Sequence, residues 1–583
     1  MSVEKNSDNP NTTHTGAHHF LAGLTDLDID YVFANLGTDH APLIETLAQW
    51  QRDHRPHPKI ILCPHENVAI HMAAGVAAVT GKGQAVLVHV DAGTANAAMG
   101  VHNLCRTRLP VLLMSGKTPF TLRNELPGSR DNYVHFVQDP FDIGSLVRPY
   151  VKWEYSLPSG ITAKEVLRRA HSVMQSDPPG PVYLTLPREV LAETIEDRAV
   201  QPFNAQRYGP VALGGIDDMR ARAIAEQLMR AKHPMVVTSY LGRKAQAVKA
   251  LETLAELCGI RVYEFSPSYL NISRSSPCFG GFDPAHGLQN ADLGLLLDVD
   301  VPWLPKFTQE NPNTQWIHID VDPIKKDFPM WGFATDMRIQ ADCATVLEQV
   351  IQHVRDMQTP AYASEVASRI ASWEVDRKNR ADRLAQLESD PGKQGAISSA
   401  YLLSTLGSAL APHDIVINEA IRNAPQLLNH LHRTEPLTLL GSAGGGLGYS
   451  GGIALGAKLA RPEVRVVQVV GDGGFHFSTP TSVYATSQSY GLPIFTVVLD
   501  NGGWQAVKES VLRMHPKGVA LQQDEFQSRL QGKHRHFEQV AQAFGAYGEC
   551  VSEPDDVPAA IARCLHALDE GRSALLNVQI GLQ

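Results

Sequence analysis

The chain has 583 residues, of which 43% are hydrophobic and 19% are charged. This composition is typical of globular proteins, and the length predicts three or four domains. With 51 basic and 61 acidic residues the formal net charge is −10, which argues against nucleic acid or an anionic membrane as a partner. No apolar run is long enough to predict a membrane span. Seven scattered cysteines without a CxxC pair predict free thiols in a reducing cytoplasm.

The first block of alternating strand and helix patterns covers residues 20–191. We expect the polar segment that precedes it, residues 1–19, to be a flexible tail. Apolar runs bounded by turn residues predict buried strands within the block, and a longer periodic segment predicts a helix. The strands are expected at 31–33, 60–62, 85–90, 110–114 and 181–186, and the helix at 94–106.

The alternation recurs twice more along the chain. A linker rich in Pro and Gly, 192–215, leads to a central block at 216–350, and a charged helical linker at 351–395 leads to a last block at 396–583. Strands are expected at 234–239, 293–298 and 316–319 in the central block and at 415–418, 464–470, 494–499 and 574–580 in the last. Buried strands that alternate with helices predict an α/β fold of three doubly wound parallel-sheet domains.

Polar motifs follow two strands of the last block. Gly471-Asp472-Gly473-Gly474 comes after strand 464–470, and Asp500-Asn501-Gly502-Gly503 comes after strand 494–499. The carboxyl ends of parallel strands meet at one edge of a sheet, so Asp472 and Asn501 are expected to face one another. A carboxylate and an amide oxygen suit Mg²⁺, and the glycines allow backbone N–H groups to approach phosphate. The pair predicts a site for a metal-bridged diphosphate.

These paired motifs resemble the diphosphate motif of thiamine-diphosphate (ThDP) enzymes. The resemblance places metal ligands at Asp472, Asn501 and the carbonyl of Gly503, and cofactor contacts at Gly471, Gly473 and Gly474. Two residues depart from the pattern, since Asp500 stands where an Asn is usual and Gly474 where a small hydroxyl residue is common. The resemblance extends over residues 20–580, and it implies a pyrimidine domain at 20–191, a central domain at 216–350 and a diphosphate domain at 396–583.

Two further segments carry the resemblance. Residues 441–457, GSAGGGLGYSGGIALGA, are similar to the glycine-rich segment of acetolactate synthases and benzoylformate decarboxylases. The resemblance implies cofactor contacts at Gly446 and Leu447, with Leu447 supporting the bent cofactor. Glu66 opens an Ala- and Gly-rich segment expected to be helical. The family places a catalytic Glu there, which contacts N1′ of the aminopyrimidine and promotes its imino tautomer.

The segment from His89 to Asn96 resembles HSAAGTGN of benzoylformate decarboxylase. The resemblance implies that His89 is an active-site acid/base and that Asn96 lies at the cofactor. Thr38 stands where that decarboxylase has a substrate-binding Ser, and His40 is a further candidate at the substrate. Ser276 replaces a His of the same enzyme, and it cannot serve as a proton shuttle near neutral pH.

The resemblance implies a ThDP- and Mg²⁺-dependent enzyme that is acetolactate-synthase-like. Such an enzyme decarboxylates a 2-oxo acid through a ThDP enamine and transfers the acyl anion equivalent to a second carbonyl. The alternative is a non-oxidative decarboxylase of benzoylformate decarboxylase type, which releases an aldehyde. A nicotinamide or flavin oxidoreductase is disfavoured because no GxGxxG follows a strand. A silent ThDP-binding subunit is disfavoured by the presence of Glu66, Asp472 and Asn501.

The resemblance also bears on FAD and on oligomeric state. Bound FAD is not expected, because the segment Leu297–Trp303 lacks the Arg-Phe-Asp-Asp-Arg run of flavin-containing acetolactate synthases. In the family the activating Glu comes from one subunit and the diphosphate site from the other. A homodimer or a dimer of dimers is therefore expected, with no nucleic-acid or membrane partner.

Overall fold

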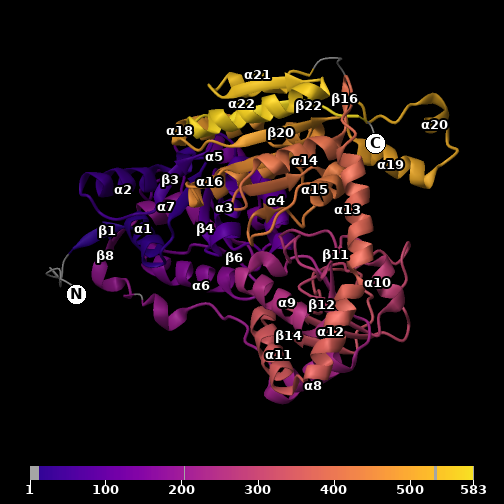
Figure 1. The fold of residues 1–583 in the computed structure, drawn as a ribbon. Coiled ribbons are helices and arrows are strands. Elements are labelled where there is room, and N and C mark those ends of the chain that lie inside the picture. Colours follow the sequence, from indigo (N-terminus) through magenta and orange to yellow (C-terminus); the bar gives the residue numbers. More distant parts are fainter. Residues whose placement is uncertain (1–11, 203, 531–534, 582–583) are drawn as a thin grey trace. The chain divides into compact units, whose positions relative to one another are not determined.

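The computed structural model describes residues 12–202, 204–530 and 535–581. Figure 1 shows the helices and strands of these residues, and the chain divides into two compact units. Unit 1 comprises Met1–Val211 together with Gly444–Ala460, and unit 2 comprises Ala212–Ala443 and Arg461–Gln583. Segment 444–460 was expected in the diphosphate domain, but its contacts group it with unit 1.

Unit 1 is built on a six-stranded parallel sheet in the order β3-β2-β4-β5-β7-β6. Its strands are β2 (Tyr31–Ala34), β3 (Lys59–Leu62), β4 (Gln84–Val88), β5 (Val111–Lys117), β6 (Glu154–Ser156) and β7 (Val182–Pro187). Its helices are α1 (Gly16–Asp26), α2 (Ala41–Arg52), α3 (Glu66–Thr80), α4 (Val90–Thr107), α5 (Val134–Val137), α6 (Ala163–Gln175), α7 (Arg188–Ala192) and α16 (Ser450–Ala460). A two-stranded antiparallel sheet joins β1 (Thr13–Thr15) and β8 (Thr194–Glu196).

Unit 2 holds two more six-stranded parallel sheets. The central one has the order β11-β10-β9-β12-β13-β14 and the last one β18-β17-β19-β20-β22-β21. Central strands are β9 (Pro234–Thr238), β10 (Arg261–Glu264), β11 (Phe279–Gly281), β12 (Leu293–Leu297), β13 (Gln315–Asp320) and β14 (Met337–Gln340). The last sheet has β17 (Ile415–Glu419), β18 (Leu439–Leu440), β19 (Val466–Gly471), β20 (Phe495–Asp500), β21 (Tyr547–Val551) and β22 (Ala574–Gln579).

Helices alternate with the strands of these two sheets along the chain, and a short antiparallel pair, β15 (Gly392–Lys393) with β16 (Ala396–Ile397), leads into the last one. Around the central sheet are α8 (Asp218–Arg230), α9 (Ala245–Cys258), α10 (Ala285–Asn290), α11 (Cys343–Met357), α12 (Pro360–Ser372) and α13 (Glu374–Glu388). With the last sheet are α14 (Ser399–Ala409), α15 (Ala424–His430), α17 (Asp472–Phe477), α18 (Pro480–Tyr490), α19 (Gln505–Met514), α20 (Val519–Gln523), α21 (Phe537–Gln542) and α22 (Val557–Asp569).

Three parallel sheets confirm the expected α/β fold class. Every expected strand is present within a few residues of its predicted position, because most of them are buried apolar runs, whereas β3 buries only Ile61. The expected tail at 1–19 differs, since β1 and α1 occupy Thr13–Asp26 and Thr15 caps α1 with its hydroxyl. The apolar face of this helix is buried and includes Phe20, Leu21 and Leu24. Residues 1–11 lie outside the described chain.

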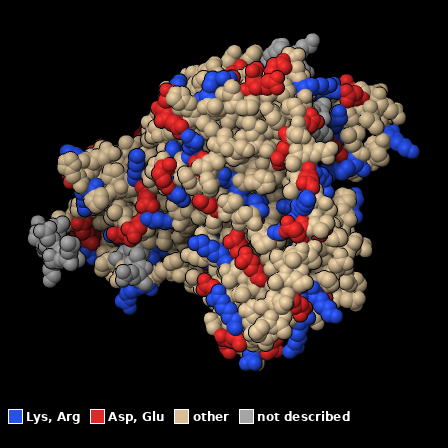
Figure 2. Space-filling model, viewed as in Figure 1, with Lys and Arg blue, Asp and Glu red and all other residues tan. Residues whose placement is uncertain are grey.

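The surface charge and the state of the cysteines can both be compared with the sequence predictions. Figure 2 shows acidic and basic side chains interspersed over the visible face. All seven cysteines are free thiols. Among the described residues, no helix has the length and apolar character needed to span a membrane.

Candidate functional site

The first part of the site lies in unit 2, where β19 and β20 pair in parallel and end side by side. Asp472 is the first residue of α17 and is 2% exposed. Its Oδ1 accepts a hydrogen bond of 2.8 Å from the backbone N–H of Gly473, and its Oδ2 accepts one of 2.8 Å from that of Gly503. The loop after β20 therefore reaches Asp472, as the two motifs predict. Gly503 has φ +146°, a conformation that favours glycine.

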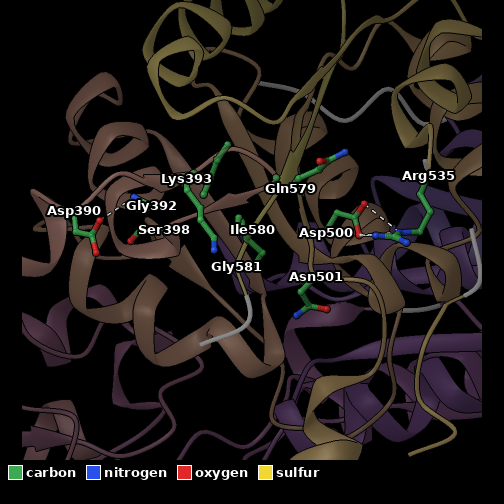
Figure 3. A pocket seen from close by; sticks show the side chains of 13 residues that line it. Asp390, Gly392, Lys393, Ser398, Asp500, Asn501, Arg535, Gln579, Ile580 and Gly581 are labelled. Carbon is green, nitrogen blue, oxygen red and sulfur yellow. Dashed lines mark hydrogen bonds and ion pairs between the residues drawn. The ribbon is translucent and has the colours of Figure 1, made fainter. Parts of the chain in front are cut away.

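Asp500 lies at the end of β20, and its carboxylate faces Arg535 (Figure 3). Arg535 donates hydrogen bonds of 2.9 and 2.7 Å from Nε and Nη2 to Asp500 Oδ1. Burial and the charge of Asp500 raise the pKa of Asp472 to about 7. The carboxylate that departs from the family motif at Asp500 is paired with a guanidinium from another part of the chain. The sequence motif gave no signal for Arg535.

The residues at this edge fit a hard divalent cation. Asn501 Oδ1 is buried and has no hydrogen-bond partner among the described residues, so an amide oxygen is available as a ligand next to the Asp472 loop. The described chain holds no cluster of three His, Cys, Asp or Glu side chains that would form a metal site by itself. Asp500, Asn501 and Arg535 also line a cavity of about 800 Å³ beside β15 and β16.

The second part of the site lies in unit 1, at the start of α3. Glu66 is the first residue of this helix and is 7% exposed. Its Oε2 accepts a hydrogen bond of 3.1 Å from Nδ2 of Asn96, so two residues expected at the cofactor are in contact. A Cβ at Gly93 would lie 3.3 Å from Glu66 Oε1. The glycine leaves space beside this oxygen, where a ligand could bind.

The glycine-rich segment before α16 is held by α4. Asn103 donates from Nδ2 to the carbonyl of Gly446 at 3.1 Å, and its Oδ1 accepts from the Gly446 N–H at 3.1 Å. A Cβ at Gly446 would lie 2.4 Å from Met99 Sδ, so the backbone of this segment approaches α4 closely. Leu447 follows and is half-buried. Asn103 was not predicted from the sequence, because a lone Asn within a helix carries no motif.

The third group surrounds His89, which directly follows β4 and occupies the position before α4, as expected for a residue at the carboxyl end of a strand. Its Nδ1 lies 2.5 Å from Asp39 Oδ1, and its Nε2 lies 2.9 Å from Gln138 Oε1. Thr38 Oγ1 lies 3.4 Å from His135 Nε2. His40 is fully buried and its Nε2 lies 3.2 Å from Asp39 Oδ2. His40 therefore presents no exposed atom to a substrate, in contrast to the position expected for it.

Comparison with known proteins assigns the chain to a class. Residues 14–146 match the family model described as thiamine pyrophosphate enzyme, N-terminal TPP binding domain. Residues 423–578 match the model described as thiamine pyrophosphate enzyme, C-terminal TPP binding domain. The protein belongs to the thiamine-pyrophosphate-dependent enzymes, whose two cofactor-binding domains hold the groups described above.

Its relatives and structural neighbours have related activities. The chain is 25% identical to acetolactate synthase isozyme 3 large subunit of Escherichia coli K12, over 89% of this chain and 88% of that one. It is 24% identical to acetolactate synthase of Mycobacterium leprae, over 93% and 84%. Its fold matches the thiamine diphosphate-dependent 4-hydroxybenzoylformate decarboxylase of Rhodococcus jostii RHA1 with a TM-score of 0.76, at 19% identity over 98% of this chain and 100% of that one.

Proposed function

We propose that the enzyme uses ThDP and Mg²⁺ to decarboxylate a 2-oxo acid and to join the remaining acyl group to a second carbonyl compound. The observation that carries the proposal is the buried Asp472 beside the unpartnered Asn501 Oδ1 at one sheet edge. This is the donor set that a Mg²⁺-bound diphosphate requires. The similarity to acetolactate synthases supports transfer to a second carbonyl.

The chain's own residues divide the work of holding the cofactor. Asp472, Asn501 and the Gly503 carbonyl would bind the metal, and Gly471, Gly473 and Gly474, which have no side chains, would allow the diphosphate to approach the backbone closely. Gly446 and Leu447 would contact the cofactor rings.

The acid/base roles fall to unit 1. Glu66 would hold a proton at N1′ of the aminopyrimidine, while Asn96 orients its carboxylate. Bound ThDP supplies a nucleophilic carbon and an electron sink for loss of CO₂. We assign the substrate contact to Thr38 and His89 rather than to the buried His40.

The second candidate function is decarboxylation with release of an aldehyde. The observation that favours it is the pair of polar contacts on the His89 ring, which suits this residue as a proton donor. Incubation with pyruvate and with phenylglyoxylate, followed by chromatography of the products, separates the two functions. Acetolactate or acyloin supports the carboligase, and free aldehyde under every acceptor contradicts it.

Cofactor uptake tests the common part of both functions. Isothermal titration calorimetry with ThDP in the presence of MgCl₂ is expected to show saturable binding, and EDTA is expected to weaken it. The variant Asn501→Leu should bind ThDP at least tenfold more weakly, because it removes one amide ligand. The matched variant Asn290→Leu, at the end of α10 far along the chain, should bind as wild type. Equal binding by both variants would contradict the assignment of Asn501.

We propose further that the enzyme works as a homodimer or a dimer of dimers. A run of unit 1 leaves large apolar side chains exposed, namely Phe120, Leu122, Tyr133, Phe136, Val137 and Phe141, and exposed apolar side chains close in sequence favour association. Sedimentation velocity is expected to give a mass of two or four chains. A monomer at micromolar concentration that retains full activity would contradict this proposal.

A further inference from the structure

A buried carboxylate lies behind the His89 ring. Asp39 is 1% exposed and its Oδ1 lies 2.5 Å from His89 Nδ1, so the ring donates this hydrogen bond to the carboxylate. On the opposite side of the ring, the amide oxygen of Gln138 accepts from Nε2 at 2.9 Å. Both ring nitrogens therefore face oxygen acceptors. A ring that donates from both nitrogens is the doubly protonated imidazolium.

His40 does not compete for this charge. Its Nδ1 accepts a hydrogen bond of 3.0 Å from the Gly37 N–H, so the neutral ring carries its proton on Nε2, which faces Asp39 Oδ2 at 3.2 Å. Burial lowers the pKa of His40, which keeps this ring neutral. Asp39 therefore has one cationic partner, His89.

The backbone is arranged around this contact. A Cβ at Gly37 would lie 2.0 Å from His89 Nδ1, and a Cβ at Gly116 would lie 1.3 Å from Asp39 Oδ2. Only glycine at these two positions leaves room for the carboxylate and the ring. Val90, directly after His89, has φ +28°, which is rare for a β-branched residue. Strain of this kind persists only where the surroundings enforce it, and it occurs often at functional sites.

We propose that Asp39 is a positioning residue that holds His89 as an imidazolium, and that His89 Nε2–H is the donor for an anionic oxygen of the substrate. Gln138 accepts this hydrogen bond in the structure, and a substrate carboxylate would take its place. The exchange is favourable because a charge-assisted hydrogen bond is stronger than one to a neutral amide. The inference rests on the proposed function, and it assigns the group that would bind the carboxylate of the 2-oxo acid.

The charges around the ring agree with this assignment. The hydrogen bond from His89 to Asp39 raises the pKa of His89, whereas partial burial lowers it. The charge of Asp91 also raises the pKa of His89. His40 faces the pair from the same turn as Asp39 and is neutral. His135 is close to Thr38, and burial lowers its pKa. No other titratable group of the described chain is in hydrogen-bond contact with the His89 ring.

The ionisation of His89 can be measured without cofactor. Diethyl pyrocarbonate reacts with neutral imidazole, and peptide mass spectrometry gives the rate at His89 between pH 5 and 9. In wild type the midpoint is expected above about 6.5, the value of a free histidine. In Asp39→Asn the acid dissociation constant of His89 should rise at least tenfold, so its midpoint should move to lower pH by a unit or more. The control Asp91→Asn, which removes a nearby carboxylate not bonded to the ring, should change it less than twofold.

Three outcomes would overturn the proposal. The first is a wild-type midpoint at or below 6.5, which is decisive even if Asp39→Asn fails to fold. The second is a midpoint in Asp39→Asn equal to wild type, and the third is an equal effect of Asp91→Asn. Because this measurement needs no cofactor, a failure of ThDP to bind would contradict the proposed function without touching the Asp39 contact.

Enzyme with ThDP and Mg²⁺ bound tests whether His89 donates to an anionic oxygen of the substrate. Phenylglyoxylate is expected to protect His89 from modification at least tenfold better than its neutral methyl ester, and equal protection would overturn the role of the anionic oxygen. Asp39→Asn should also shift the basic limb of the kcat/KM profile to lower pH by a unit or more, since activity is lost when the imidazolium loses its proton. A uniform loss of activity with an unmoved profile would indicate a structural role only.

Discussion

Asp500 shows, at the scale of the residue, how a change in a motif depends on a distant partner. A carboxylate here is 3% exposed and lies beside Asp472, so its charge is unfavourable unless it is paired. Arg535 supplies the pairing through two nitrogens. The usual Asn of the family would need no cation at this position. A change at Arg535 is therefore expected to be tolerated only together with a change at Asp500.

Removal of Arg535 tests this coupling. Arg535→Met leaves a buried carboxylate unpaired, which should lower the free energy of unfolding by about 3 kcal/mol. Asp500→Asn in the same chain should restore most of that loss, because a neutral amide needs no counter-charge. Urea unfolding followed by fluorescence measures both. Arg563→Met, which breaks an exposed pair with Glu549, should have a much smaller effect. A double variant no more stable than Arg535→Met would disprove the coupling.

A substitution at Glu66 tests whether its carboxylate activates the cofactor. Glu66→Gln keeps the shape and the contact with Asn96 but removes the carboxylate, so turnover should fall roughly 10²–10⁴-fold. Calorimetry should show ThDP binding within a few-fold of wild type. Glu165→Gln, in the first turn of α6, serves as the control with unchanged turnover. Full activity of Glu66→Gln would show that another group activates the cofactor.

At the scale of the element, the packing of α3 against α16 connects two parts of the site in unit 1 (Figure 1). Glu66 opens α3, and the segment with Gly446 and Leu447 leads into α16. The two helices approach closely because glycines face each other. A Cβ at Gly75 would lie 2.3 Å from the Ile453 carbonyl oxygen. This close contact sets where the start of α3 lies relative to the glycine-rich segment.

A single methyl group should therefore disturb the pair. A Cβ at Gly456 would lie 2.1 Å from the Met72 carbonyl oxygen, and backbone cannot yield as a side chain does. Gly456→Ala should lower the free energy of unfolding by about 1–3 kcal/mol and weaken ThDP binding. Gly445→Ala, where nothing lies within 4 Å of the new Cβ, is the matched control. Thermal unfolding measures the stability of both variants, and calorimetry measures their ThDP binding. Equal stability of the two variants would contradict close packing of α3 against α16 at Gly456.

For the whole molecule, buried histidines connect stability to pH. Burial lowers the pKa of His18 to about 3 and that of His71 to about 4. His71 is 1% exposed, with Nδ1 2.9 Å from the Asn67 carbonyl and Nε2 3.3 Å from Asn103 Nδ2. These partners suit the neutral ring. In the unfolded chain the same histidines take up protons near pH 6.5.

The sign of the pH effect follows. Because the folded pKa is depressed, the contribution of His71 to stability is complete above about pH 6.5 and is lost as the pH falls toward 4. The shift corresponds to about 3 kcal/mol for this residue. The urea midpoint of wild type should therefore fall over this range, and that of His71→Gln should fall less steeply. Parallel curves for the two proteins would contradict the assignment to His71.

Much of the fold and part of the site follow from local patterns. The buried strands and the paired Asp472 and Asn501 motifs are visible in the sequence, because apolar runs and glycine turns carry their own structural preference. Short edge strands such as β6 and β18 were not predicted, since few residues with little periodicity leave no pattern. Asp39 was also not predicted as a partner of His89, because their contact spans 50 positions and depends on two glycines that make room for it.

Residue types at short spacing were therefore enough to predict the fold class and the family, because strands, turns and glycine motifs depend on neighbours in the chain. The pairing of charges and polar groups became visible only in the folded chain. The tertiary structure placed Arg535 on Asp500, Asn103 on Gly446, and Asp39 behind His89. These contacts join segments far apart in the chain, and their strength depends on burial and distance, which exist only once the chain has folded.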